Sequence, residues 1–599
     1  MTPTPEQLLE QHWGYTSFRS PQGEIVNALC SGKDVLGMLP TGGGKTICYQ
    51  IPGLLLDGLT IVISPLIALM TLQHQELLDK GIKSYHFHGK YTPRQLDTAF
   101  RNLRYGKYKF VFMAPERLNN PLFTEFLGNA HVGLIAVDEA HCISQWGFDF
   151  RPSYLNVTQL RKMFPEAPVV ALTASATDRV KRDIAEQLAI EEATIFEGSI
   201  RRANLSLHKY FTPNKERQLL RLLDRLEGTG IIYCKTRRNC EVVAKTVSNA
   251  GIAATYYHAG LDQEEKQQRQ QAWMNNQVRL MAATTAFGMG IDKSDVKWVI
   301  HWDVPDTLEG YYQEVGRGGR NGDESAAYLL YHQGDIQRIN TQKNDLPQPE
   351  WIAALYHRIC SKYQIAIGAG LGHTIHFSIP ALADALQVPM HHLLSGIRLL
   401  QQRGVWQFYE STLLQAEVLI TSRATDWDRL SDDLRETLEG IIRFYPFASE
   451  EPTAISLQRL ARVGLGATSA LHVRLLQLAK KKLLEYTPEQ PGSALVFTAD
   501  RLSVKALHFP SKFIDQWISS KQERANAVLA FLESESCIMN DLAVYFGQEA
   551  LEKCGKCSNC TLDHYPDEEA VKEKLKAGAT LDDIWLDMNC PPDALQSYR

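Results

Sequence analysis

The chain has 599 residues, of which 44% are hydrophobic and 22% are charged, and its formal net charge is −5. This length exceeds what one hydrophobic core organises, so we expect three to five domains. The weak negative charge excludes a protein that attracts nucleic acid through its overall field, so any such contact needs local basic strips. No apolar run reaches the ~20 residues that span a bilayer, and the first residues lack the apolar core of a signal peptide. We therefore expect no membrane partner and a cytoplasmic location.

Short apolar runs alternate with amphipathic stretches from Asp34 to about Phe196, and the pattern recurs from Gly230 to about Tyr331. Strands that alternate with helices predict parallel, doubly wound sheets. The sequence thus predicts an α/β protein with two similar lobes in tandem, over residues 1–200 and 201–340.

The pattern changes after the polar, proline-containing segment Asn340–Glu350. Two successive helix–turn–helix–strand patterns predict winged-helix-like modules at residues 345–425 and 426–520. A helix then leads into a small cysteine-rich domain at residues 521–563, and an acidic tail follows at residues 564–599.

The stretch "MLPTGGGKTICYQ" follows the first predicted strand and opens a helix. Its glycines let backbone N–H groups face a phosphate chain, Lys45 can reach the β and γ phosphates, and the Thr46 hydroxyl can hold Mg²⁺. The strict motif has Gly where this chain has Leu39, and an ordinary glycine turn before a helix is the alternative. The predicted ATP-binding residues of this loop are Thr41, Gly42, Gly43, Gly44, Lys45 and Thr46.

Two carboxylates, Asp138 and Glu139, end the apolar run "VGLIAV" in the same lobe. Ligands of α/β sheets bind beyond the carboxyl ends of the strands, so both acids are expected beside the glycine loop. There Asp138 can bind Mg²⁺, and Glu139 can orient and deprotonate an attacking water. A solvated acidic turn is the alternative reading.

Two arginines, Arg317 and Arg320, lie three residues apart in "YYQEVGRGGRNG" of the second lobe. We expect both on one face of a helical turn, from which they can stabilise charge on a γ-phosphate held by the first lobe. An ordinary surface helix is the alternative. If the two lobes share one site, each cycle of hydrolysis must change their separation, which is the property of a motor.

Nine ordered stretches resemble the superfamily-2 helicases: "FRSPQ", "TGGGKT", "SPLIALM", "APERL", "DEAHCISQW", "TASAT", "YHAGL", "TTAFGMGIDK" and "QEVGRGGR". The longer stretch "DEAHCISQWGFDFRP" resembles the RecQ family of DNA helicases. The resemblance runs from about Gln11 to Tyr331 and resumes from Gln522 to Asp563. It implies two RecA-like lobes and an enzyme that uses ATP and Mg²⁺ to move 3′ to 5′ on single-stranded DNA and to unwind duplex or branched DNA.

The resemblance also implies roles for single residues. Tyr15, Arg19 and Gln22 would hold the adenine, while Thr173, Ser175 and Thr177 would couple the nucleotide to the lobe interface. His141 would relay between Glu139 and the loop that follows it. Further positions beside the nucleotide are Gly288, Gly290, Asp292 and Gln313.

In the relatives, the loop after His141 senses single-stranded DNA. Here Trp146, Phe148 and Phe150 offer faces on which bases can stack, and Arg151 can meet a phosphate. The family usually has His where this chain has Phe148. Aromatics that only cover the first lobe are the alternative.

Cys554, Cys557 and Cys560 bring three thiolates around one point, and zinc takes four ligands in a tetrahedron. The family spacing implies Cys537, rather than Cys590, as the fourth ligand. A redox pair is the alternative. All four positions of such a site are filled by protein, which makes the zinc structural.

The resemblance implies single-stranded and forked duplex DNA as partners, single-strand-binding protein as a further partner, and a role in DNA repair, recombination and the SOS response. In the usual family layout zinc follows the second lobe directly, whereas residues 345–520 intervene here and could replace the duplex-binding element. Two other functions remain open: an RNA-directed ATPase of the same superfamily, and a DNA-binding or annealing scaffold without catalysis.

Overall fold

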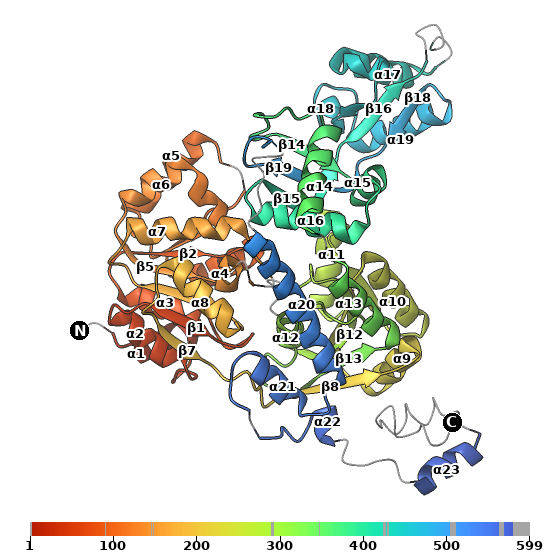
Figure 1. Cartoon of the computed structure of the whole chain (residues 1–599). Coiled ribbons are helices and arrows are strands. Elements are labelled where there is room, and N and C mark those ends of the chain that lie inside the picture. Colours follow the sequence, from red (N-terminus) through yellow and green to blue (C-terminus); the bar gives the residue numbers. More distant parts are fainter. Residues whose placement is uncertain are drawn as a thin grey trace. The chain divides into compact units, whose positions relative to one another are not determined.

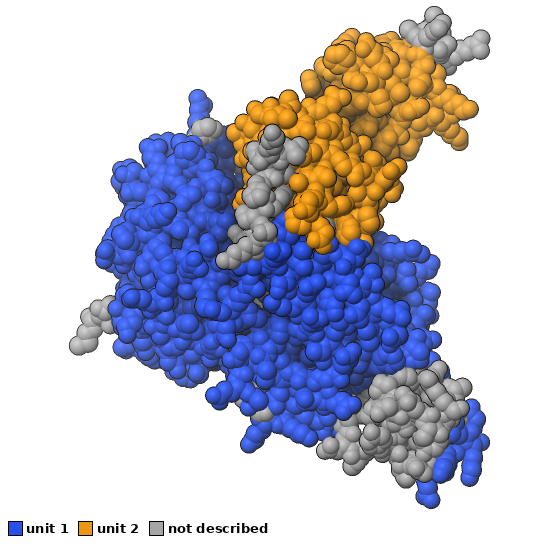
Figure 2. Space-filling model, in the orientation of Figure 1, with its two compact units in different colours: residues 1–346, 512–599 blue, residues 347–511 orange. Residues whose placement is uncertain are grey.

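The structure is a computed structural model, and it describes residues 3–89, 91–144, 146–147, 149–288, 293–346, 348–422, 427, 430–503, 511–550, 552–561 and 568–578. The chain forms two compact units, residues 1–346 with 512–599 and residues 347–511, which Figure 2 shows in different colours. Within the described residues, no helix is both long and apolar enough to cross a membrane.

A seven-stranded sheet in the order β3-β4-β2-β5-β6-β1-β7 forms the first lobe, and all of its strand pairs are parallel. Both faces of a doubly wound sheet are covered, which explains why its central strands are nearly continuous apolar runs. The strands are β1 (Val35–Met38), β2 (Leu59–Ile63), β3 (Ser84–His86), β4 (Phe110–Met113), β5 (Val132–Val137), β6 (Val169–Thr173) and β7 (Thr194–Glu197) (Figure 1).

Successive residues of the first-lobe strands enter two separate cores. On β1, Val35 packs with Ile25 and Tyr49 on one face, whereas Leu36 packs with Leu160 and other residues on the opposite face. The covering helices are α1 (Pro5–Trp13), α2 (Gln22–Cys30), α3 (Ile47–Leu55), α4 (Ile67–Asp79), α5 (Pro93–Tyr105), α6 (Pro121–Gly128), α7 (Thr158–Met163) and α8 (Asp178–Leu188), with 3₁₀ turns η1 (Pro115–Asn119), η2 (Ala140–Ile143) and η3 (Pro152–Val157).

A six-stranded parallel sheet in the order β10-β11-β9-β12-β13-β8 forms the second lobe. Its strands are β8 (Leu205–Phe211), β9 (Thr229–Tyr233), β10 (Ala254–Tyr257), β11 (Leu280–Ala283), β12 (Val296–His301) and β13 (Ser325–Tyr331). Its helices are α9 (Lys215–Arg225), α10 (Arg237–Asn249), α11 (Gln263–Met274), α12 (Leu308–Val315) and α13 (Gln333–Asn344). The predicted pair of parallel-sheet lobes is therefore confirmed.

The cysteine-rich segment packs onto the second lobe, although residues 347–511 separate the two in sequence. It contains α20 (Ser511–Glu533), α21 (Ile538–Tyr545) and α22 (Ser558–Thr561), and α23 (Glu568–Lys576) follows it. Phe531 and Leu542 share one hydrophobic core with Tyr311 of α12. The buried Lys209 of β8 donates to the carbonyls of Phe531 and Ser534 at 2.6 and 2.7 Å. This module is thus an integral part of the second lobe.

The second unit contains two small antiparallel sheets, in the orders β14-β19-β15 and β17-β16-β18. The first module consists of α14 (Pro349–Lys362), β14 (Thr374–Phe377), α15 (Ile379–Leu386), α16 (Met390–Gln402), β15 (Trp406–Leu414) and β19 (Gln490–Phe497). The second consists of β16 (Ala416–Ile420), α17 (Asp432–Phe444), η5 (Pro446–Ser449), β17 (Thr453–Ile455), α18 (Leu457–Arg462), α19 (Thr468–Lys480) and β18 (Leu484–Thr487).

These two modules are nested, which differs from the tandem arrangement with a boundary at residues 425/426 that the sequence predicts. The last strand, β19, pairs with both β14 and β15 and completes the first module's sheet. The whole second module lies between β15 and β19 in the chain. Apolar patterns identify strands but do not name their partners, so the sequence could not reveal this return.

The nesting can be tested by replacing residues 415–489 with Asn-Gly, because Leu414 and Gln490 are directly paired across β15 and β19. A two-residue Asn-Gly turn suits such a hairpin. We expect a soluble chain that unfolds cooperatively in calorimetry.

A matched deletion of residues 426–500 follows the tandem boundary but removes β19. It leaves buried residues such as Ile375 and Trp406 without their sheet, so we expect aggregation. The opposite ranking of the two deletions would contradict the nested arrangement.

Candidate active site

The glycine loop connects β1 to α3 and has a backbone that only glycine adopts readily. Gly42 and Gly44 have φ values of +79° and +72°. A Cβ on Gly44 would lie 2.4 Å from Gln22 Nε2, and one on Gly43 would lie 2.8 Å from the Pro40 carbonyl oxygen. The loop therefore leaves backbone, rather than side chains, to face a ligand at the N-terminus of α3, as a phosphate site requires.

Lys45 lies in this loop and forms an ion pair with Glu139, with Nζ 3.1 Å from Oε1 and little exposure of either side chain. Burial opposes the charge on Lys45, but Glu139 and Asp138 outweigh it and raise the lysine pKa. Burial and the neighbouring Glu139 carboxylate raise the pKa of Asp138 to about 6. A buried pair of carboxylates beside one ammonium group is suited to receive a divalent cation.

Glu139 follows the end of β5 in a left-handed conformation, with φ +48°. Such a conformation costs of order 1–3 kcal/mol for a non-glycine residue and is common at functional sites. Its N–H donates to Asp138 Oδ1 at 2.9 Å. Its buried Oε2 accepts no hydrogen bond from the described residues, although His141 Nδ1 lies 3.4 Å from it.

His141 connects the two carboxylates to the neighbouring strand β6. Its Nδ1 lies 3.0 Å from Thr173 Oγ1 and 3.4 Å from Glu139 Oε2. Burial lowers the His141 pKa despite the opposing effect of Glu139, so the ring is neutral at pH 7. The structure thus brings Glu139, His141 and Thr173 together, and His141 Nε2 lies 3.7 Å from Cys142 Sγ. The expected relay from Glu139 to the loop after His141 stays a prediction.

The two expected arginines of the second lobe lie in the turn that follows α12, rather than on a helix. A Cβ on Gly42 would lie 3.3 Å from Arg320 Cγ, and one on Gly316 would lie 2.9 Å from Thr41 Cβ. Residues of both segments line a cavity of about 340 Å³. The glycine loop and the arginine turn therefore lie beside each other, and a nucleotide site shared between them stays a prediction.

Arg317 is more deeply placed than Arg320. Its side chain is buried, and its Nε donates no hydrogen bond within the described part of the chain. A Cβ on Gly288 would lie 3.0 Å from Arg317 Nη2, which places Gly288 beside this guanidinium. Arg320 opposes the charge of Lys45 and Arg317 helps to lower the pKa of Glu139, so both arginines lie close enough to act on the first-lobe groups. These cations and the paired acids form a donor set that fits a magnesium–triphosphate complex.

The residues expected to hold adenine are arranged differently from the prediction. The Gln22 amide donates to the carbonyls of Gly43 and Gly44 at 2.9 and 3.1 Å, and its oxygen accepts from the Arg19 N–H at 3.0 Å. Gln22 therefore fixes the glycine loop in this structure. Arg19 lines the cavity, whereas Tyr15 is 52% exposed.

The remaining expected nucleotide residues are only partly described. Gln313 is half-buried on α12, and Ser175 is buried, with a hydroxyl that makes no hydrogen bond within the described residues. Gly290 and Asp292 lie outside the described residues.

The aromatic loop has protein partners that the sequence did not indicate. Trp146 packs against the first-lobe core, and the guanidinium carbon of Arg179 lies 3.8 Å from its ring centroid. Glu523 of α20 lies 3.8 Å from the same guanidinium. Arg151 pairs with Asp149 at 3.1 Å, which satisfies the charge expected to meet a phosphate. Phe150 is half-buried, and Phe148 lies outside the described residues.

The four cysteines expected to hold zinc lie together: the sulfur atoms of Cys537, Cys554, Cys557 and Cys560 are all within 4.8 Å of one another. Cys537 is the N-cap residue of α21, Cys554 and Cys557 precede α22, and Cys560 lies within α22. This tetrad fits a tetrahedral zinc ion. Cys590 lies outside the described residues.

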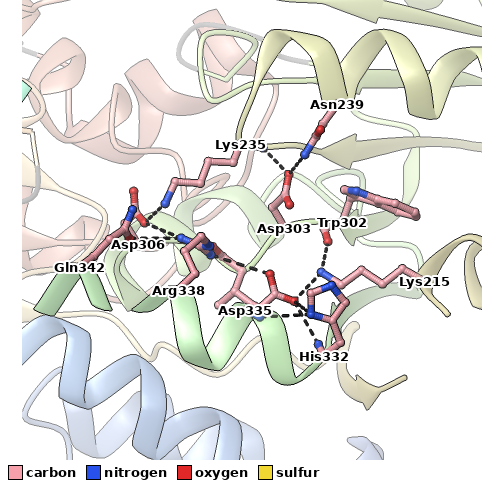
Figure 3. Close-up of polar contacts among 11 residues, drawn as sticks. Lys215, Lys235, Asn239, Trp302, Asp303, Asp306, His332, Asp335, Arg338 and Gln342 are labelled. Carbon is pink, nitrogen blue, oxygen red and sulfur yellow. Dashed lines mark hydrogen bonds and ion pairs between the residues drawn. The ribbon is translucent and has the colours of Figure 1, made fainter. Parts of the chain in front are cut away.

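A network of charged side chains at the carboxyl ends of β9, β12 and β13 was not predicted (Figure 3). Lys215 pairs with Asp335 at 2.7 Å and donates to the Trp302 carbonyl at 2.7 Å. Asp303 accepts from the Lys235 N–H at 2.8 Å and from the Asn239 amide at 2.9 Å. The network fixes three adjacent loop ends, and its members are too far apart in sequence for spacing alone to reveal it.

Comparison with known protein families supports this site. Residues 19–184 match the DEAD/DEAH box helicase family, residues 214–322 the helicase conserved C-terminal domain, and residues 511–561 the RecQ zinc-binding family. The first segment contains the glycine loop and all four expected DNA-contacting residues, the second contains the arginine turn, and the third contains the cysteine tetrad.

Individual relatives agree with these matches. The chain is 40% identical over 351 residues to the ATP-dependent DNA helicase RecQ of Pasteurella multocida, covering 58% of this chain and 55% of that protein. It is 40% identical over 336 residues to the probable ATP-dependent DNA helicase RecS of Bacillus subtilis, covering 55% of this chain and 68% of that protein. The match to the ATP-dependent helicase SGS1 of Saccharomyces cerevisiae is 39% identical over 340 residues and covers 54% of this chain and 23% of that protein.

The matched segment thus spans only part of each relative, and it leaves the nested modules of the second unit outside the family matches. It nevertheless covers more than two thirds of the Bacillus subtilis protein at 40% identity. From this similarity and from the geometry of the site, we conclude that the chain belongs to the RecQ family of helicases.

Proposed function

We propose that this chain hydrolyses ATP with Mg²⁺, moves 3′ to 5′ on single-stranded DNA and unwinds duplex or branched DNA in repair and recombination. The observation that carries the proposal is the contact between Arg320 and Gly42, because it completes one anion site from two separate lobes. A site of this kind couples each hydrolysis event to the distance between the lobes. Family membership alone supports a cytoplasmic location, a part in the SOS response and contact with single-strand-binding protein.

The ion pair of Lys45 with Glu139 suggests how nucleotide binding prepares the site. The Lys45 ammonium can exchange its carboxylate partner for the β and γ phosphates, and the Glu139 carboxylate is then released to take a proton from the attacking water. Thr46 and Asp138 would hold Mg²⁺, which neutralises phosphate charge when it is bound. Arg317 and Arg320 stabilise the charge that develops on the transferred group.

The proposal is tested by measuring ATP turnover with no nucleic acid, with single-stranded DNA and with RNA of the same sequence. We expect the strongest stimulation by DNA, unwinding of a forked duplex with a 3′ tail, and loss of both activities in Lys45→Ala, because an arginine-rich site without this lysine loses its contact to the β and γ phosphates.

Two outcomes would contradict this function. Stronger stimulation by RNA would favour an RNA-directed ATPase. Absence of turnover in the wild-type chain, with DNA annealing unaffected by Lys45→Ala, would favour a scaffold.

The aromatic loop generates a separate prediction. Trp146 must exchange Arg179 for a base if it stacks on DNA, and stacking of a base on an aromatic ring is worth about 1–3 kcal/mol. We expect Trp146→Ala to bind a fluorescent ATP analogue normally but to lose most of the stimulation of hydrolysis by DNA. The matched control is Tyr105→Ala, which removes an aromatic ring that is 77% exposed on the same lobe. Retained stimulation in Trp146→Ala would assign the loop to packing alone.

The cysteine tetrad predicts one tightly bound zinc ion per chain. We expect elemental analysis of purified protein to show zinc in the wild type and in Cys590→Ser, and its loss in Cys537→Ser together with lower thermal stability. The loss of stability follows because the tetrad belongs to the second-lobe core. Metal loss in Cys590→Ser alone would refute the choice of Cys537 as fourth ligand.

A further inference from the structure

The linker between the two lobes contains Gly198, whose N–H and carbonyl form hydrogen bonds with different parts of the protein. The Gly198 N–H donates to the Met38 carbonyl of β1 at 2.7 Å, which is a contact with the first lobe. The Gly198 carbonyl instead accepts from the Gln548 amide at 2.9 Å, in the segment that follows α21 of the cysteine-rich module. The linker therefore passes from one body to the other at Gly198, where a glycine offers a flexible point.

Beyond Gly198 the linker is held in register on the second lobe. The Ile200 N–H donates to Gln548 Oε1 at 3.3 Å, and the Ile200 carbonyl accepts from the Tyr312 hydroxyl at 3.0 Å. The Ile200 side chain is buried in the core that the second lobe shares with the cysteine-rich module. These contacts determine where the next residues of the linker can reach.

Arg202 reaches the turn that carries the two active-site arginines. Its Nη1 donates to the Gly316 carbonyl at 2.9 Å, and its Nη2 donates to the Gly319 carbonyl at 2.7 Å. These carbonyls belong to the residues immediately before Arg317 and Arg320. The guanidinium of Arg202 therefore holds the turn by hydrogen bonds at Gly316 and Gly319, the two positions that set the direction of the arginine side chains.

The guanidinium of Arg202 has no carboxylate partner among the described residues, and burial lowers its pKa. Hydrogen bonds from a charged donor are worth about 1.5–3 kcal/mol each, so these two carbonyls are its main compensation. Asn204 also stabilises the turn, because its amide donates to the carbonyls of Gly319 and Asp323 at 2.8 and 2.7 Å.

The turn requires these external hydrogen bonds because it is rich in glycine. Gly319 and Gly322 have φ values of +60° and +90°, and Gly316 and Gly318 lie between the end of α12 and Gly319. Glycine loses the most conformational freedom on ordering, so this turn does not become rigid by itself. Catalytic groups must be held within about 0.5 Å of their productive position, and supporting hydrogen bonds supply that precision.

We propose that Arg202 is a positioning residue for the hydrolysis reaction: from the linker between the lobes, it holds the turn of Arg317 and Arg320 in the orientation that meets the γ-phosphate. This inference rests on the proposed function. Arg202 lies four residues beyond Gly198. The linker that connects the two lobes would therefore also orient Arg317 and Arg320.

The test compares Arg202→Ala and Arg202→Lys with Arg201→Ala. Arg201 is the neighbouring arginine of the linker, and its side chain makes no hydrogen bond or ion pair in the described part of the structure. We expect Arg202→Ala to lower DNA-stimulated kcat at least about tenfold, since a misplacement of 1 Å can cost 10²-fold, while KM for ATP changes less than about threefold. The kcat of Arg202→Lys should lie between that of Arg202→Ala and that of the wild type, because one ammonium group cannot span both carbonyls.

A second background separates positioning from general damage to the fold. In a chain that already carries Arg317→Ala and Arg320→Ala, we expect Arg202→Ala to reduce turnover no further, because no arginine remains to be aimed. An equal further loss in this background, or a wild-type kcat in Arg202→Ala alone, would overturn the proposal.

A readout without turnover keeps this inference distinct from the proposed function. Hydrogen–deuterium exchange of the nucleotide-free protein should be faster across residues 312–323 in Arg202→Ala and unchanged in Arg201→Ala. If the wild-type chain hydrolyses no ATP, the proposed function fails while this exchange result still decides whether Arg202 holds the turn. Unchanged exchange in Arg202→Ala would refute the inference.

Discussion

The close approach of Arg320 to Gly42 is the contact on which the proposed function of this molecule depends. An added Cβ at Gly42 would lie 3.3 Å from Arg320 Cγ, and the φ of +79° at this position favours glycine, so a glycine here suits the close approach of the second lobe to the loop that would hold a triphosphate. The ammonium of Lys45 lies in the same glycine loop of the first lobe and pairs with Glu139, which follows Asp138. Charge of both signs is therefore divided between two bodies, and a ligand that binds both must also set their separation.

The rest of the first unit positions these charged groups on the two lobes. Parallel sheets place the glycine loop, the acids and Thr173 at the carboxyl ends of neighbouring strands, where hydrogen bonds connect them. The cysteine-rich module is built into the core of the second lobe, and its Gln548 forms hydrogen bonds with Gly198 and Ile200 of the linker. A structural metal in that module would thus stabilise the hinge region as well as its own loop.

Much of the site could be predicted because its signals are local. The spacing of Gly42, Gly44 and Lys45, the acids at the end of an apolar run and the cysteine pairs each specify their chemistry within a few residues. The partners of Gln22, Trp146 and β19 could not be predicted, because Gly43, Arg179 and β14 become their neighbours only through tertiary packing. For the same reason the sequence did not indicate a role for Arg202, since a hydrogen bond to a distant carbonyl leaves no pattern in the sequence.

The most direct measurement of the central claim is a crystal structure of the full chain with Mg²⁺, a non-hydrolysable ATP analogue and a single-stranded DNA. The account predicts that Lys45 leaves Glu139 for the phosphates, and that the guanidinium of Arg317 or Arg320 lies within hydrogen-bond distance of the γ-phosphate bound to the first lobe. A γ-phosphate held by the first lobe alone, with both arginines directed to other surfaces, would contradict it.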